Sequence, residues 1–140
     1  MHTIERMIVT HPIRSHHVQN ELVELIESCF ECAQACNACA DACLGELVVE
    51  RLRRCIRLNL DCADVCVVTG RIVSRVGSNN DAVVDQLVRA CGVACRVCME
   101  ECDYHANMHE HCRVCAEACR HCLEACERFL AGEEALQRDA

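Results

Sequence analysis

The sequence predicts an all-α protein, an antiparallel four-helix bundle with a cysteine-lined core. The 17 cysteines of the 140-residue chain fall in four stretches, and within each stretch they are spaced by three, four or seven residues. Steps of three and four keep side chains on one face of a helix, whereas a strand would point alternate cysteines to opposite sides. Pro12 is the only proline, so the rest of the chain contains few helix-breaking residues.

Turn and capping signals divide the chain into helices. Gly45 suits a helix C-cap, and residues 77–81, Gly-Ser-Asn-Asn-Asp, are the clearest turn, with serine and asparagine available as N-cap. Asn107 marks a further break, and Gly132 is expected to end the last apolar stretch. Short connections between the helices favour antiparallel neighbours. The helices expected from these signals lie near residues 16–44, 47–76, 81–105 and 109–131.

The chain is expected to have three parts. Residues 1–17 form an N-terminal segment, in which a short extra helix is expected before Pro12. Residues 18–131 form the cysteine-lined four-helix bundle. Residues 132–140 follow Gly132 and form a C-terminal tail.

The face of the last helix opposite its cysteines is charged. Oppositely charged side chains four residues apart on a helix lie close enough to pair, and such pairs are typical of a solvated surface. The pairs expected from this spacing are Arg113 with Glu117, Arg120 with Glu124, and Glu124 with Arg128.

Composition excludes several classes of function. The formal charge is −8, which argues against binding to nucleic acid or to an anionic membrane surface, and no apolar run is long enough to cross a bilayer. The first seven residues, Met1–Met7, lack the basic segment and apolar stretch of a signal peptide, so we expect a cytoplasmic protein with reduced thiols. An odd number of cysteines also cannot pair completely within one chain, which disfavours a disulfide scaffold.

The cysteine stripe is better explained by metal binding than by core packing. Bundle cores are filled mainly by larger apolar residues, and a cavity left by a smaller residue costs about 2–5 kcal/mol. Two sulfurs three or four residues apart on a helix can instead converge on one ion without a change in the backbone. The chain has seven C-x-x-x-C pairs and five C-x-x-C pairs, and together they form a continuous ladder on four inward faces.

Ligand type and charge favour Cu(I) among the thiophilic metals. Soft thiolates select Cu(I), zinc or iron–sulfur clusters. Four thiolates around a zinc ion would leave a charge of −2 in a buried lumen, whereas one Cu(I) that displaces one thiol proton leaves the lumen neutral. The spacing does not isolate groups of four for zinc and lacks the runs typical of iron–sulfur clusters. A zinc- or cadmium-sequestering protein and an iron–sulfur or thiol redox protein stay open as alternatives.

The expected metal ligands form a column and a mouth. The mouth lies in the connection between the third and fourth helices, where imidazole and thioether groups suitable for Cu(I) stand beside the outermost cysteines. The column ligands are Cys29, Cys32, Cys36, Cys39, Cys43, Cys55, Cys62, Cys66, Cys91, Cys95, Cys98, Cys102, Cys112, Cys115, Cys119, Cys122 and Cys126, and the mouth ligands are His105, Met108, His109 and His111.

The opposite end of the bundle is expected to be closed. Apolar residues from all four helices meet there, beside the 77–81 turn, and form an apolar plug without metal ligands. The plug residues are Leu22, Leu25, Val73, Val76, Val84, Val88, Phe129 and Leu130. The histidines at 2, 11, 16, 17 and 121 lie off the stripe and are expected on the surface.

The sequence resembles the bacterial copper storage proteins, and in particular the cytosolic branch of that family, which lacks an export signal. The resemblance covers about residues 18–130 and rests on three runs of cysteines spaced by three and four, at 29–43, 91–102 and 112–126. The second helix departs from this pattern, since Asn59 and Thr69 occupy inward positions. Asn59 is a candidate weak oxygen ligand or, in the favoured interpretation, fixes the register by hydrogen bonding.

The resemblance implies a store or buffer that binds multiple Cu(I) ions inside each bundle. It also implies homotetramers and no catalysis. No Ser/His/Asp set, phosphate loop or carboxylate pair stands out in the sequence, so no enzyme is expected. The expected partners are other copies of the chain and a copper donor or acceptor protein.

Overall fold

The computed structural model describes residues 2–139, and within them every regular element is helical. The helices expected near 16–44 and 81–105 are confirmed with small changes at their ends. The elements are α1 (His2–Val9), α2 (Gln19–Leu44), the 3-10 turn η1 (Val49–Leu52), α3 (Arg53–Val73), α4 (Asp81–His105) and α5 (Glu110–Asp139).

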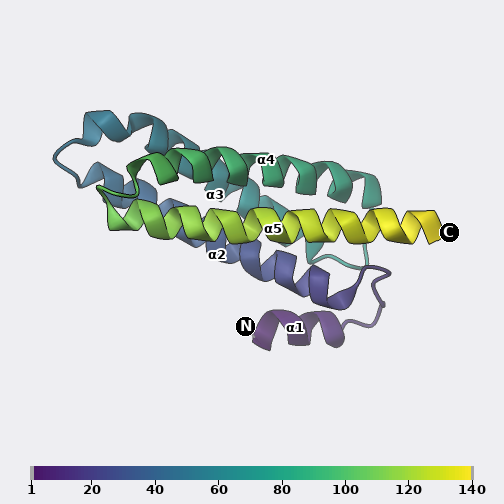
Figure 1. Cartoon of the computed structure of the whole chain (residues 1–140). Coiled ribbons are helices and arrows are strands. Elements are labelled where there is room, and N and C mark those ends of the chain that lie inside the picture. Colours follow the sequence, from purple (N-terminus) through teal and green to yellow (C-terminus); the bar gives the residue numbers. More distant parts are fainter. Residues whose placement is uncertain (1, 140) are drawn as a thin grey trace.

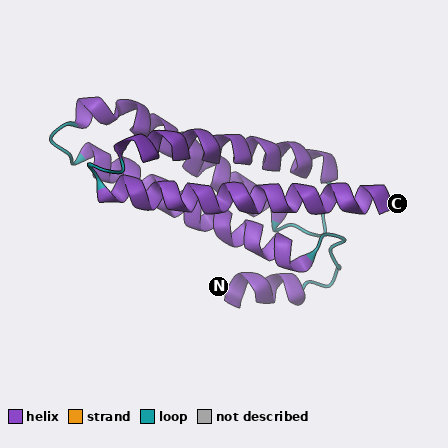
Figure 2. Cartoon of the chain, in the orientation of Figure 1, coloured by secondary structure: helices purple, strands orange, loops and turns teal. Residues whose placement is uncertain are grey.

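Helices α2 to α5 form an antiparallel four-helix bundle, as predicted (Figure 1). Each of them packs against two neighbours, in the ring order α2, α3, α4, α5, so α2 lies diagonally opposite α4. Short loops join the consecutive helices at alternate ends of the bundle (Figure 2). The cysteine faces of all four helices therefore point to one shared axis.

The connections lie where the turn signals place them. Helix α2 ends at the C-cap Gly45, whose φ of −85° is an ordinary right-handed value, so glycine is not required there for its backbone angle. Asn80 occupies the N-cap position of α4, but its side chain makes no capping hydrogen bond. The helix expected from 47 begins instead as η1 and becomes α3 at Arg53.

The expectation that Gly132 ends the last helix is wrong. Helix α5 continues through Gly132 to Asp139 and projects beyond the other helices (Figure 1). A methyl group at Gly132 would collide with the carboxylate of Glu21 on α2. Glycine therefore leaves room for that flexible carboxylate rather than stopping the helix.

The short helix expected before Pro12 is confirmed as α1. It lies alongside α2, outside the bundle (Figure 1). Ile4 and Ile8 are half-buried and pack against the buried core, which explains their spacing of four on an amphipathic helix. Within residues 2–139, no helix combines the length and apolar character needed to cross a membrane.

Only part of the expected surface pairing on α5 is correct. Arg113 lies 3.8 Å from Glu117, as its spacing predicts. Arg120 instead pairs with Asp103 on α4 at 3.3 Å, and Arg128 pairs with Glu24 on α2. Both arginines reach a carboxylate on a neighbouring helix, which spacing within one helix cannot reveal.

Small residues beside the cysteines bring the helices together. A methyl group added at Gly70 of α3 would stand 3.0–3.2 Å from the ring of Phe30 on α2. One added at Gly92 of α4 would meet its nearest atoms, on Leu123 and Cys126, at 3.7 Å, an ordinary contact distance. The α2–α3 contact therefore depends on the absence of a side chain at residue 70.

We expect these two glycines to respond differently to replacement by alanine. Gly92→Ala should raise the free energy of unfolding by about 0.8–1 kcal/mol, because alanine is the better helix former. Gly70→Ala should gain less or lose stability, since the Phe30 ring must move. Urea denaturation of the reduced protein, followed by far-UV circular dichroism, measures both. An equal or larger gain for Gly70→Ala would contradict the close α2–α3 contact.

Candidate metal centre

All 17 cysteines face the axis of the bundle, as predicted, and all are free thiols. The exposed fraction of each is 2% or less. Helices α2 and α5 each contribute five, α4 contributes four and α3 contributes three. Together, the 17 buried cysteine side chains form a continuous column of sulfur along the bundle.

The sulfurs lie at distances that suit a shared metal ion. Cys36 Sγ is 3.6 Å from Cys119 Sγ and 3.7 Å from Cys115 Sγ, and Cys66 Sγ is 3.7 Å from Cys95 Sγ. A metal–sulfur bond of about 2.3 Å places two ligand sulfurs about 3.8–4.0 Å apart at tetrahedral or trigonal angles. The thiols can therefore hold ions with little movement of the backbone.

The groups of sulfurs close enough to share an ion overlap with one another. Cys32, Cys36, Cys119 and Cys122 each belong to two such groups, within which all ligand atoms lie within 4.8 Å of one another. A ligand that belongs to two groups can bridge two ions. From mouth to plug, five groups are Cys39/Cys43/His111/Cys112, Cys36/Cys98/Cys115/Cys119, Cys32/Cys36/Cys62/Cys119, Cys32/Cys66/Cys95/Cys122 and Cys29/Cys91/Cys122.

Asn59 is fully buried within the sulfur column. Its Oδ1 accepts hydrogen bonds from Cys98 at 3.1 Å and Cys115 at 3.3 Å, and its amide donates to Cys55 at 3.7 Å. These contacts support the expected hydrogen-bonding role in linking α3 to α4 and α5. Thr69, the other inward polar residue of α3, donates its hydroxyl to the Val65 carbonyl at 2.7 Å and so turns toward its own helix.

No positively charged side chain is buried in the column, within the part of the chain that the structure describes. Asn59 and Thr69 are the only buried residues with polar side chains among those described, apart from the cysteines themselves. Burial raises the pKa of Cys43, which favours the neutral thiol. Hydrogen bonds from other thiols, Cys119 above all, lower the pKa of Cys62. Because neighbouring thiols lie within hydrogen-bond distance of one another, the protonation of each depends on that of its neighbours.

The mouth is built around the imidazole of His111. Its Nδ1 lies 3.4 Å from Cys39 Sγ and 3.6 Å from Cys112 Sγ, so this nitrogen faces the outermost thiols. Its Nε2 lies 2.8 Å from the carboxylate of Glu46. His109 also approaches Glu46, at 3.0 Å, and stacks on His111 with 5.5 Å between ring centres. The mouth therefore joins the column directly through His111.

Glu46 is the mouth residue that sequence reasoning missed. It lies in the α2–α3 connection, 63 or more residues before the histidines it contacts, and no spacing rule links them. Hydrogen bonding to His111 is the largest cause of its lowered pKa. Burial acts to lower the pKa of His111, but hydrogen bonds that its ring makes to Cys39 and Glu46 outweigh burial and raise this pKa.

The other two expected mouth ligands lie further out. His105 is held by Glu101 on its own helix, with 2.9 Å between the nitrogen and oxygen. Met108 is 77% exposed. Both line, together with His109, a groove of about 610 Å³ beside the mouth. The four residues thus form an outer pair, His105 and Met108, and an inner pair, His109 and His111.

The opposite end is closed by the expected apolar cluster. Leu22, Leu25, Val88 and Phe129 are at most 2% exposed, and the remaining plug residues are buried or half-buried against them. His17 contacts both Phe129 and the carboxylate of Glu133 there, which ties the N-terminal segment to this end. His121 is exposed, as expected from its place off the stripe.

The chain is similar to proteins with a known association with copper. The family model described as "Copper storage protein" matches residues 18–131. The copper storage protein Ccsp from Streptomyces lividans, loaded with 10 copper equivalents, is 46% identical with a TM-score of 0.90, over 92% of this chain and 98% of that chain. A structure of the cytosolic copper storage protein from Streptomyces lividans with five coppers is 51% identical with a TM-score of 0.79, over 81% and 94% respectively.

A third similar structure is the Cu(I)-bound copper storage protein BsCsp3. It is 36% identical with a TM-score of 0.67, over 76% of this chain and 94% of that chain. The family match spans the whole cysteine-lined bundle, from the residue before α2 to residue 131 of α5, beyond the last cysteine at 126. The chain therefore belongs to the copper storage protein family.

Proposed function

We propose that this chain stores and buffers multiple Cu(I) ions on the thiols of its 17 cysteines. The observation that carries this proposal is the overlap of the sulfur groups in a lumen without buried cations. Shared thiolates can bridge neighbouring ions, so the number of ions can approach the number of thiols. The solved relatives are described as loaded with copper or Cu(I)-bound, which supports the same cargo here.

The charge of the lumen favours Cu(I) over zinc or cadmium. Some sulfur groups contain four cysteines and could surround a tetrahedral ion. Four thiolates around a divalent ion would carry a charge of −2, and no buried side chain among those described could neutralise it. One Cu(I) for each displaced proton keeps the lumen neutral throughout loading.

The burial of the thiols disfavours a redox function. A thiol–disulfide exchange site needs an accessible thiolate, whereas every cysteine here is at most 2% exposed. Storage needs no catalysis, and we propose no enzymatic activity. We place the protein in the cytoplasm, where thiols stay reduced, as for the relative that is described as cytosolic.

We propose that ions pass through the mouth and not through the plug. His111 connects solvent to the first thiols, since its ring contacts both Glu46 and Cys39. Neutral imidazole and thioether ligands suit Cu(I) and release it more readily than thiolates do. The plug offers only apolar side chains to an ion at the other end.

We propose a homotetramer, as the family resemblance implies. The outer face of α2 and α3 supports self-association, because exposed apolar residues gather there. Leu44 is 61% exposed and Leu60 is 44% exposed, and both line a shallow groove of about 400 Å³. Val67 and Val68 continue this apolar surface along α3. Burial of such a surface against another copy is the expected driving force.

The reduced protein should bind well over ten Cu(I) ions per chain, on the order of the 17 thiols available for bridging. Anaerobic titration with Cu(I) against a chromophoric chelator, with free thiols counted in the same samples, measures this capacity. Competition with Zn(II) supplies the control. Saturation at about four ions or fewer, with zinc preferred, would indicate tetrahedral zinc sites instead.

Replacing His105, Met108, His109 and His111 with alanine should slow both loading and removal of Cu(I) by a chelator. Total capacity should stay nearly unchanged, because the thiols remain. His121→Ala is the matched control, since His121 is exposed on the outside of α5. Unchanged rates together with a large loss of capacity would indicate that the four residues are storage ligands and that Cu(I) enters elsewhere.

Light scattering should report a particle of four times the 15.7 kDa chain mass at micromolar concentration. Leu60→Glu should lower this mass, because it places a charge on the apolar α2–α3 face. Val114→Glu, which changes a 51% exposed residue on α5, should leave it unchanged. A monomer in the unaltered protein would rule out the tetramer.

A further inference from the structure

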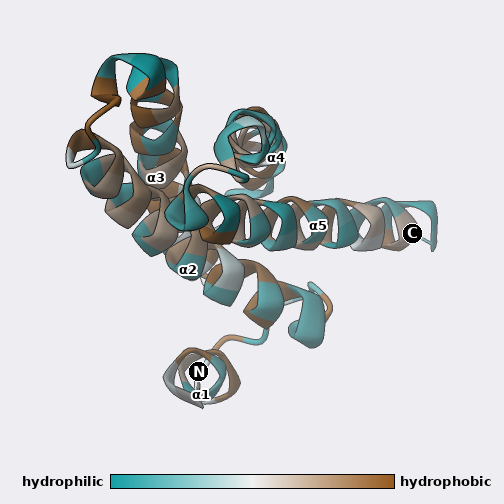
Figure 3. Ribbon diagram, turned by 60° about the vertical axis from the view of Figure 1, so that its left-hand side comes forward, coloured by the Kyte–Doolittle hydropathy of each residue, from teal (hydrophilic) through white to brown (hydrophobic). Residues whose placement is uncertain are grey.

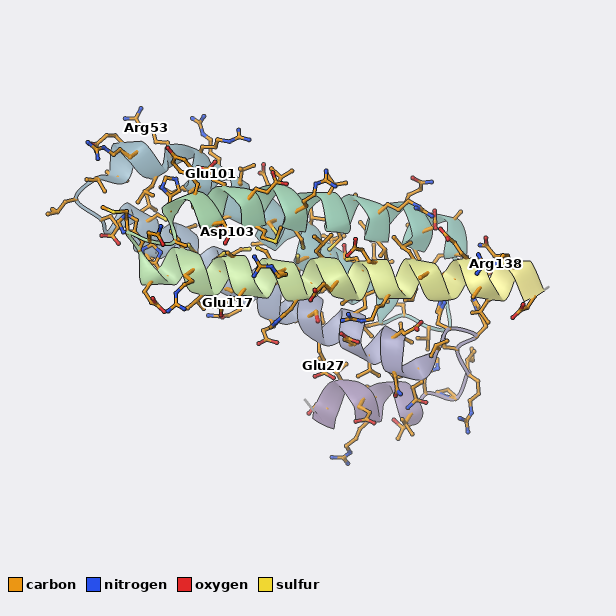
Figure 4. The ribbon with its side chains drawn as sticks, viewed as in Figure 1. Glu27, Arg53, Glu101, Asp103, Glu117 and Arg138 are labelled. Atoms are coloured by element: carbon orange, nitrogen blue, oxygen red, sulfur yellow. The ribbon has the colours of Figure 1, made fainter. Side chains whose placement is uncertain are left out.

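Three arginines beside the mouth lack the ion pairs that the arginines of α4 and α5 make. Between Arg89 and Arg128, every arginine of α4 and α5 pairs with a carboxylate. In η1 and the first turns of α3, Arg51, Arg53 and Arg57 are exposed and have no carboxylate within 4 Å among residues 2–139. Figure 4 shows Arg53 at this end of the bundle among other side chains that end in nitrogen. A protein of charge −8 therefore presents a patch of three unpaired arginines beside its mouth, with exposed Glu50 as the neighbouring carboxylate in the chain.

This arginine patch borders the groove that leads to the mouth. Arg51 lines the groove together with His105 and His109, so its guanidinium and the mouth imidazoles share one depression. Arg54, the remaining arginine of this turn, is held 3.3 Å from Glu101, the carboxylate that also binds His105. The positive charge is therefore placed where an incoming ion would pass.

Exposed apolar side chains surround the same groove. Tyr104 is 82% exposed and Met108 is 77% exposed, and both line it. Leu47, in the neighbouring α2–α3 connection, is 98% exposed. This connection is coloured as hydrophobic in Figure 3. Tyrosine, methionine and arginine are the residues enriched at protein interfaces, so the composition favours a protein partner over a small ion.

We propose that the docking surface formed by Arg51, Arg53, Arg57, Tyr104 and Met108 binds an acidic protein that carries Cu(I). This inference rests on the proposed storage function and names the partner of its mouth. Acidic side chains of the carrier lie against the three arginines, and its metal-bearing loop enters the groove toward His109. Charge complementarity of this kind mainly raises the rate of association.

The transfer is a ligand exchange without a change in oxidation state. Cu(I) leaves a thiolate of the carrier and passes through the mouth imidazoles to a thiol such as Cys39. The proton displaced from that thiol is taken up by the thiolate vacated on the carrier. Copper and protons therefore balance between the two proteins.

Two synthetic carrier peptides test the docking surface. Both contain the same Cys-x-x-Cys loop with one Cu(I), and they are flanked by glutamates in one and by lysines in the other. Anaerobic stopped-flow measurement gives the rate of transfer to the whole protein. The glutamate peptide should transfer about tenfold faster or more at low salt. This advantage should disappear near 1 M salt, where screening acts within about 3 Å.

Two triple variants distinguish the effect of charge at the docking surface from the effect of the protein's net charge on the rate of transfer. Arg51→Glu, Arg53→Glu and Arg57→Glu together should remove the tenfold preference for the glutamate peptide. Arg71→Glu, Arg75→Glu and Arg138→Glu change the net charge equally, away from the docking surface, and should retain most of the preference. Equal losses in both triple variants, or equal rates for both peptides with the unaltered protein, would overturn the proposal.

Tyr104→Ala tests contact rather than charge. It should slow transfer from the glutamate peptide several-fold, while loading from a small Cu(I) chelate stays the same. Slowing of both routes alike would mean that Tyr104 shapes the mouth and does not contact a carrier. Capacity measured with the chelate should be unchanged in every variant. Failure to take up Cu(I) by any route would contradict the proposed storage function. Full capacity with no preference between the peptides would contradict only the proposed docking surface.

Discussion

A cysteine side chain is too short to fill the centre of an ordinary helix bundle, so a column of them requires four helices that remain close together. The sequence provides for this by placing small residues beside the cysteines. Ala33, Ala63, Ala116 and Gly92 each follow a cysteine and are buried. Gly70 serves the same purpose where Phe30 crosses from α2. Close packing then brings sulfurs of different helices to 3.6–4.0 Å, which is the separation that a shared ion needs.

The same packing determines the electrostatics of the lumen. Among residues 2–139, no charged side chain is buried in the column, and burial acts to raise the pKa of its thiols, as at Cys43. Such a lumen tolerates Cu(I), which replaces a proton charge for charge, better than a divalent ion. At the mouth, the carboxylates of Glu46 and Glu101 lie against imidazoles rather than against the thiols. The opening is thus polar while the column stays apolar.

Much of this arrangement could be predicted from the sequence, because helical spacing determines which residues share a face. It placed all 17 cysteines on the axis and grouped the apolar residues that close one end. It also placed His111 near the outermost thiols, which it contacts. What it missed depends on contacts between elements. Glu46 meets His111 from another connection, Arg120 and Arg128 find partners on neighbouring helices, and Gly132 accommodates Glu21 instead of ending α5. Spacing along one helix contains no information about these partners.

The apolar plug closes one end of the bundle, which leaves the mouth as the proposed route for ions. The plug is held by buried side chains such as Leu22 and Val88, and it is further covered by the N-terminal segment through His17 and Glu133. On the proposed route, an ion that enters at the mouth leaves by the same end, since the plug itself is made of apolar side chains. Uptake and release then compete for the same imidazoles. A carrier that delivers copper and one that removes it would have to meet the protein at one end, where unpaired arginines and exposed Tyr104 lie beside the groove. The direction of transfer would then depend on the relative affinities of the carrier and the column for Cu(I), rather than on separate entry and exit sites.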